Sequence, residues 1–341
     1  MRKAMKIWLI IGASLVFLGL IVFGGVMTML KWDFTKLSTT KYETNTHEIG
    51  EAYQSISVNT NTADFILVPS EHAERRVICH EEKNVKHSVA VKEDTLVIDA
   101  VDTRKWYEHI GISFGKPKIT VYLPQGEYDA LSVKSSTGDV EIPKDFNFES
   151  IDISEDTGDV TCYASVSQCI KIKTDTGNIR IENLSAGMLD LSVTTGDVKL
   201  VGVTSVGDVK ISVSTGKTSA TDVKCKNLIS SGNTGDMSLK NVIAAEAFSI
   251  ERSTGDVKLD GCDAAELRIT TDTGDVKLDA CDADELFIKT DTGDVTGSLL
   301  SEKVFITQTD TGRIDVPKAT SGGRCEITTD TGNIKISIVT P

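Results

Sequence analysis

The chain has 341 residues, of which 40% are hydrophobic and 25% are charged, and its formal net charge is −14. Residues 1–31 carry four basic and no acidic side chains, which leaves −18 on the remainder. Such an acidic surface repels nucleic acid, so it excludes a DNA- or RNA-binding function. The seven cysteines include no CxxC pair or metal-ligand cluster, and their odd number argues against a dense disulfide framework outside the cell.

Residues 7–30 are the first predicted element, a transmembrane helix. These 24 residues contain no charge, and an α-helix needs only ~20 residues to cross a bilayer. Basic residues flank the segment, namely Arg2, Lys3 and Lys6 before it and Lys31, Lys36 and Lys41 after it. The positive-inside rule therefore places residues 1–6 in the cytoplasm, although the later lysines weaken the asymmetry. We expect an uncleaved single-pass anchor in the cell membrane with the bulk of the chain outside, and cleavage stays open as the alternative.

An irregular region follows the anchor. Residues 31–52 are polar and are predicted to be a linker, and residues 53–130 are predicted to hold lead-in strands and a cap. The stretch "SISVNTNTADFILV" (55–68) resembles a degenerate coil, with Ala63-Asp64 where Gly-Asp stands later. The segment 102–116 concentrates aromatic residues. It either caps the open end of the strand array or exposes a contact surface.

Histidine and cysteine offer little basis for a metal centre. All five histidines precede the regular repeats, so the repeats have no histidine base or ligand. Cys79, His80 and His87 are a candidate metal set, but residues 79 and 80 point to opposite faces of a strand, so a shared ion is not expected. No GxSxG, Walker-type or HExxH motif is present. The sequence therefore predicts no catalytic residue and no cofactor.

Residues 131–341 are a regular array. Glycines recur every 19 or 20 residues at the same place in one motif: Gly138, Gly158, Gly177, Gly196, Gly216, Gly235, Gly255, Gly274, Gly293, Gly312 and Gly332. A fixed period of this size indicates a solenoid in which each unit covers the one before it. Apolar residues alternate with polar ones after each glycine, as in "GDVKL", which is typical of strands. We predict an all-β fold, a parallel β-solenoid with 19–20 residues per coil.

The triplet Asp-Thr-Gly recurs in this array, and it is also the motif of aspartic proteases. A protease needs two carboxylates that share one proton at one site, whereas six copies are spread along this chain. A repeated turn explains every copy. We expect each glycine to adopt a positive φ and each aspartate before Thr-Gly to accept hydrogen bonds from turn amides.

Two ladders of aspartates follow from the stacking. Asp275 and Asp294 share one phase, and Asp272 and Asp291 share another, with like charges about 4.8 Å apart. Lysines two residues after the first ladder, such as Lys277, are expected to screen it. A divalent cation among Asp272, Asp275, Asp291 and Asp294 is the less favoured alternative, because the nine-residue repeat of calcium-binding RTX solenoids is absent.

Cys262 and Cys281 also share one phase on adjacent coils. Their expected Cα separation permits a disulfide. Two small buried thiols are the simpler interpretation.

The lead-in "ITVYLPQGEYDALSVKSSTGDVEI", the recurrent "TDTGDV" and "TTGDVKL" coils and the single N-terminal membrane segment together resemble the DUF4097 family of bacterial putative adhesins. The resemblance covers most of the chain after about residue 50. It implies a β-strand repeat fold and carries no catalytic residue to transfer. One departure is an extra Gly-Asp-Val at Gly207, eleven residues after Gly196, where we expect a locally irregular coil.

Three functions are compatible with these features. The first is a non-enzymatic envelope rod that is anchored in the bilayer through residues 7–30 and contacts an unknown envelope protein or surface ligand. The second is an envelope-stress sensing component, a role that the family resemblance suggests. The third is an enzyme acting on polysaccharide, which needs paired carboxylates and usually aromatic platforms. We rank them in that order, since the coils hold few aromatic residues.

Overall fold

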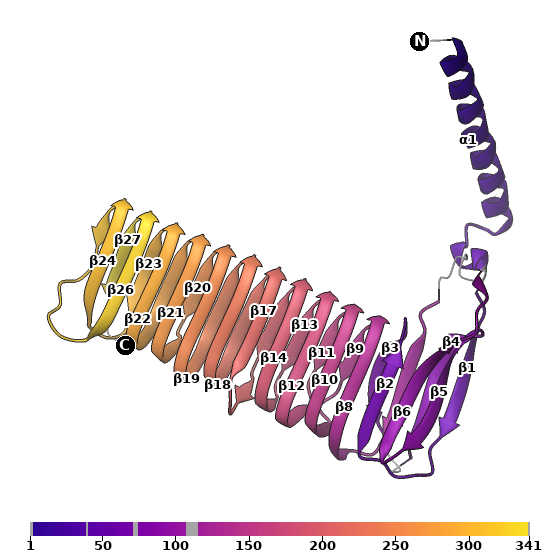
Figure 1. Cartoon of the computed structure of the whole chain (residues 1–341), viewed down its shortest axis with the longest axis horizontal. Coiled ribbons are helices and arrows are strands. Elements are labelled where there is room, and N and C mark those ends of the chain that lie inside the picture. Colours follow the sequence, from indigo (N-terminus) through magenta and orange to yellow (C-terminus); the bar gives the residue numbers. More distant parts are fainter. Residues whose placement is uncertain (1–2, 39, 71–73, 107–114, 340–341) are drawn as a thin grey trace.

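The computed structural model describes residues 3–38, 40–70, 74–106 and 115–339. Helix α1 (Lys3–Met29) projects from one end of a long β-solenoid (Figure 1). The helix ends where Lys31 and Trp32 adopt φ values of 55° and 59°. The amides of these two residues donate to the carbonyl oxygens of Thr28 and Met27, in the hydrogen-bond pattern of a Schellman motif. A 3₁₀ turn, η1 (Phe34–Leu37), follows.

An antiparallel block closes the N-terminal end of the solenoid. Its strands are β1 (Tyr42–Glu48), β4 (Arg76–Glu82), β5 (Val85–Lys92), β6 (Thr95–Asp102) and β7 (Lys118–Leu123). Strand β4 pairs with both β1 and β7, and β5 pairs with β6. The region 31–52, expected to be a linker, therefore contributes β1. Its polar sequence suits an edge strand that is solvated on one side.

The first coil consists of β2 (Ser55–Thr60) and β3 (Asp64–Pro69). It joins the block through parallel pairs of β2 with β6 and of β3 with β7. On its other side, β2 pairs with β8 and β3 with β9. Part of the aromatic segment expected to form a cap or a contact surface, residues 107–114, lies outside the described residues. Within the described part, Trp106 is exposed.

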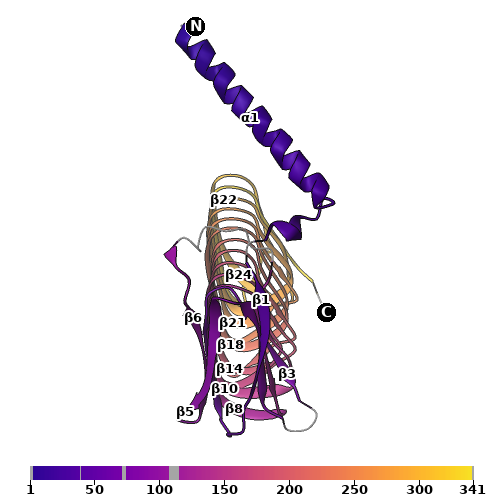
Figure 2. The same cartoon turned by 90° about the vertical axis from the view of Figure 1, so that its right-hand side faces the viewer.

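The following coils stack in parallel (Figure 1), and Figure 2 looks along the stack from the N-terminal end. Their longer strands are β8 (Gly126–Thr137), β10 (Phe146–Thr157), β12 (Ser165–Thr176), β14 (Ser185–Thr195), β17 (Val209–Thr215), β18 (Thr218–Thr234), β19 (Met237–Thr254), β21 (Asp263–Thr273) and β22 (Val276–Thr292). Their short strands are β9 (Val140–Ile142), β11 (Val160–Cys162), β13 (Ile179–Glu182), β15 (Val198–Val201), β16 (Thr204–Ser205) and β20 (Val257–Asp260).

Equivalent residues stack in register and form one continuous apolar core. Val257 pairs with Val276, and Leu259 pairs with Leu278, and all four side chains are fully buried. Burying one such side chain contributes roughly 1.5–3 kcal/mol. At the extra Gly-Asp-Val, the chain bends between β16 and β17 and leaves Val206 84% exposed, while the coil keeps its place in the stack.

The last two coils stack in the reverse of their chain order. The final strands β26 (Gly323–Thr331) and β27 (Ile334–Ile338) pair with β22 and with β23 (Val295–Leu299). Strands β24 (Lys303–Thr311) and β25 (Ile314–Asp315) pair with the other side of β26 and β27 and are outermost. This corrects the expectation that each unit covers the one before it.

The two coils differ in burial. In the inserted coil, Cys325, Ile327 and Ile334 are fully buried. In the outer coil, Thr307 is the partner of Ile327, and Ile314 is 45% exposed. The inserted coil is therefore covered on both sides, whereas the outer coil leaves part of its apolar surface exposed.

Candidate functional site

The glycine corner is the most repeated feature of the coils. Ten of the eleven motif glycines have a positive φ: Gly138, Gly158, Gly177, Gly196, Gly216, Gly235, Gly255, Gly274, Gly293 and Gly332. A Cβ on Gly293 would lie 2.0 Å from the carbonyl oxygen of Gly274 in the adjacent coil. The positive φ and the close contact with the neighbouring coil therefore both require glycine at this position. Gly312 is the exception to the expected positive φ, and its coil has a neighbour on one side only.

Aspartates directly after the glycine connect adjacent coils. Asp275 Oδ1 accepts a hydrogen bond from the amide of Asp294 at 2.8 Å, and Asp256 Oδ1 accepts one from the amide of Asp275 at 2.9 Å. The sequence analysis assigned this role to the aspartate before Thr-Gly. Among the described residues, that aspartate points to solvent instead, and Asp291 Oδ1 lies 3.3 Å from Lys289 Nζ. The cation site at Asp272, Asp275, Asp291 and Asp294 stays a prediction.

The first threonine of Thr-Asp-Thr-Gly points into the core, a role that the sequence analysis did not assign. Thr290 is fully buried, and its hydroxyl donates to the carbonyl oxygen of Gly274 at 3.3 Å. Thr174 and Thr329 make the same contact with Gly158 and Gly293. The recurrence of threonine at an inward position of the period-two pattern was the available signal.

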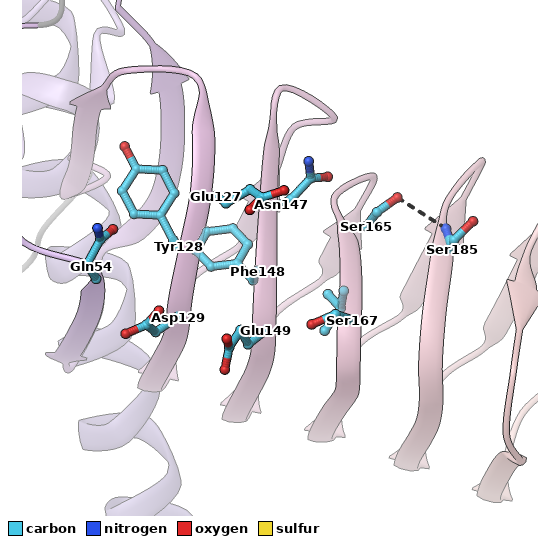
Figure 3. A pocket seen from close by; sticks show the side chains of 11 residues that line it. Gln54, Glu127, Tyr128, Asp129, Asn147, Phe148, Glu149, Ser165, Ser167 and Ser185 are labelled. Atoms are coloured by element: carbon cyan, nitrogen blue, oxygen red, sulfur yellow. Dashed lines mark hydrogen bonds between the residues drawn. The ribbon is translucent and has the colours of Figure 1, made fainter.

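A surface groove of about 490 Å³ crosses the first coils at a second corner, near the bulge between Phe148 and Ser150 (Figure 3). The buried side chains of Tyr128, Phe148 and Val166 lie beneath it, and they stack in register. Polar side chains from β8, β10, β12 and β14 border the groove on both sides of this floor: Glu127, Asn147, Ser165 and Ser185 on one side, and Asp129, Glu149 and Ser167 on the other. The sequence analysis missed this groove because its residues come from separate coils.

Comparison with known proteins decides the family. The family model Toastrack DUF4097 matches residues 53–220 and 206–340, which together make up most of the chain. The chain belongs to the DUF4097 family. Among curated proteins, none matches it.

Solved structures resemble this DUF4097 chain at low identity. A putative adhesin from Parabacteroides distasonis is 14% identical, with 87% of this chain and 98% of that chain covered and a TM-score of 0.36. A putative lipid binding protein from the same organism is also 14% identical, with 88% and 98% covered and a TM-score of 0.36. A putative cell adhesion protein from Clostridium sporogenes is 8% identical, with 88% and 100% covered and a TM-score of 0.21.

Two charged residues replace the inward threonine in this DUF4097 chain. Glu155 is 3% exposed, and neither of its carboxyl oxygens has a hydrogen-bond partner. Burial, and then the charges of Asp139, Asp159 and Asp64, raises the pKa of Glu155 to about 8. The carboxyl group is therefore largely neutral at pH 7.

Arg252 is the second charged residue in that column. Its Nη2 donates to the hydroxyls of Thr218 and Ser230, both at 2.9 Å. Gly232 in the adjacent coil has no side chain and leaves room for the guanidinium group. Burial lowers the pKa of Arg252. The hydroxyls offset part of the cost of burying this cation.

A buried polar network lies at the N-terminal end. Cys79, Glu81 and His87 gather there, whereas His80 points to the opposite, exposed face. His87 Nδ1 lies 2.7 Å from Glu81 Oε2, and His87 Nε2 lies 3.0 Å from Thr60 Oγ1. Both ring nitrogens thus have hydrogen-bond partners. These direct hydrogen bonds hold the His87 ring between Glu81 and Thr60.

The seven cysteines are free thiols, and Cys262 and Cys281 are both buried. The simpler interpretation of that pair, two small buried thiols, matches the structure. Burial also raises the pKa of the Cys162 and Cys325 thiols to about 12, so these groups are unreactive at neutral pH.

Proposed function

We propose that the chain is a non-enzymatic rod that α1 anchors in the cell membrane. In this proposal the N-terminus is cytoplasmic, and the coils lie outside, where the side of the rod contacts an envelope protein or a surface ligand, as an adhesin does. The exposure of α1 carries the proposal. Trp8, Ile10 and Phe17 are between 65% and 72% exposed, and the most apolar stretch of the helix has no side buried against the solenoid. A helix that is apolar all round requires a lipid or protein environment.

The corner geometry supports a structural rather than a catalytic role for the repeated motif. The glycine, the inward threonine and the aspartate after the glycine each contact backbone of a neighbouring coil. A catalytic dyad would need two carboxylates that share a proton in a cleft. The repeated residues therefore serve to stack coils, which leaves the side of the rod for contacts.

Protease accessibility tests the topology. Protease is added to intact cells after removal of the wall, and the coils are detected with an antibody. We expect digestion without permeabilisation, because Arg2, Lys3 and Lys6 hold the N-terminus inside. Digestion only after permeabilisation would instead indicate a cytoplasmic rod and contradict the proposal.

A further inference from the structure

The groove between β8 and β14 has an acidic end. Glu127, Asp129 and Glu149 are exposed at its border, and no lysine, arginine or histidine lines it. Gln168 Nε2 donates to Glu149 Oε2 at 3.1 Å. Within the described part of the chain, no ion pair neutralises any of these three carboxylates. The acidic end therefore carries up to three uncompensated negative charges within two adjacent coils.

Three other surface grooves differ in this respect. The groove along the aspartate corner contains Lys217, Lys258 and Lys277 beside its aspartates. The groove near the first coil includes Lys116, and the one at the C-terminal end includes Lys335. In these three grooves, basic side chains offset some of the acidic charge. The lack of such a cation at the β8–β14 groove is thus a local feature and not just a consequence of the acidic composition.

We propose that this groove binds an extended polypeptide segment that carries lysine or arginine side chains. This inference rests on the contact role proposed above. The carboxylates of Glu127, Asp129 and Glu149 would pair with the cationic groups. The buried rings of Tyr128 and Phe148 form the floor beneath these carboxylates and keep the strands that carry them in register.

The neutral part of the groove favours a polypeptide over a metal ion. Ser165, Ser167 and Ser185 continue the polar borders beyond the acidic end, and Asn147 lies beside Glu127 (Figure 3). Their amide and hydroxyl groups can hydrogen-bond to the backbone of an extended chain. A bare cation would use only the acidic end. The length of the groove across four strands therefore matches a chain that runs along the rod axis.

Peptide binding to the full chain, held in nanodiscs of zwitterionic lipid, tests the proposal. The probe is a fluorescein-labelled peptide of four Lys-Ser repeats, and the control probe has four Glu-Ser repeats. The groove variant combines Glu127→Gln, Asp129→Asn and Glu149→Gln. The matched control variant combines Asp272→Asn, Asp310→Asn and Asp330→Asn, which removes the same charge from exposed positions outside the groove. We expect the groove variant to bind the lysine peptide about tenfold more weakly and the control variant to bind it almost normally.

Three results would overturn the proposal. One is equal weakening in both variants, which would indicate general attraction to an acidic rod. Another is the absence of lysine-peptide binding at low salt. The third is binding of a cationic glucosamine oligomer at the groove without binding of the peptide. Because the protease experiment is independent, an external rod that fails to bind the peptide would disprove the groove proposal alone.

Discussion

The corner at Gly293 and the corner at Gly138 share one backbone geometry but differ in the group behind the glycine carbonyl. At the first, an inward threonine hydroxyl donates to the carbonyl oxygen: Thr329 contacts Gly293 at 3.1 Å. At the second, Glu155 occupies the threonine position, and its carboxyl oxygens have no partner. The difference shows that the stacking of coils fixes where this side chain lies. Burial at that position then favours the neutral form of a carboxyl group.

Replacement of the corner glycine should have the largest effect on stability. Gly293→Val should lower the free energy of unfolding by about 3–5 kcal/mol, because the new side chain must adopt a strained φ and clashes with the Gly274 carbonyl. Thermal unfolding of the full chain in detergent measures the loss. Gly126→Val is the control, because no atom lies within 4 Å of its added Cβ. An equal loss in both variants would contradict the requirement for glycine at the corner.

Glu155 should make stability depend on pH. Its pKa is about 8 in the folded chain and near 4.5 when unfolded, so the folded state binds the extra proton between these values. The contribution of Glu155 to stability should be fully present below pH 4.5 and should fall as pH rises to 8, by about 1.4 kcal/mol per pH unit at most. Glu155→Gln should remove this decline and raise stability at pH 9.

Unfolding curves of the wild type and of Glu155→Gln at several pH values check this expectation. Glu141→Gln is the matched control, since Glu141 is exposed and sits in the adjacent short strand β9. An identical pH profile in the wild type and in Glu155→Gln would show that Glu155 is not a buried neutral acid.

Removal of a hydrogen-bonded hydroxyl should lower the free energy of unfolding by a smaller amount. Thr290→Val keeps the shape but loses the hydrogen bond to Gly274, so we expect a loss of about 1 kcal/mol. Thr271→Val is the matched control, because the buried Thr271 hydroxyl has no partner and its removal should be neutral or stabilising. Chemical denaturation of both variants compares them. Equal losses would indicate that the hydrogen bond contributes nothing.

Addition of calcium should have the smallest effect on thermal stability. The post-glycine aspartates already accept amide hydrogen bonds, so we expect the same melting curve with millimolar calcium and with chelator at matched ionic strength. A folded-state site must raise stability on binding. A higher melting temperature in calcium, lost in Asp275→Asn, would favour the cation site at the four predicted aspartates.

Local and periodic features of the fold could be predicted from the sequence. The glycine period and the alternation of residues such as Val276 and Leu278 predict a parallel β-solenoid, because each coil is built from short-range preferences that repeat. The uncharged run from Ile7 to Leu30 likewise predicts α1. These properties depend on a residue and its near neighbours in the chain.

Only the tertiary structure decided which residues meet across coils. The insertion of β26 between β22 and β24, the unpartnered carboxyl group of Glu155 and the contact of His87 with Glu81 all depend on distant segments. The acidic groove likewise combines Glu127 with Glu149 from separate coils. Burial and charge at these positions arise only when the coils stack, since the energies of desolvation and pairing are properties of the assembled neighbourhood and not of the local sequence.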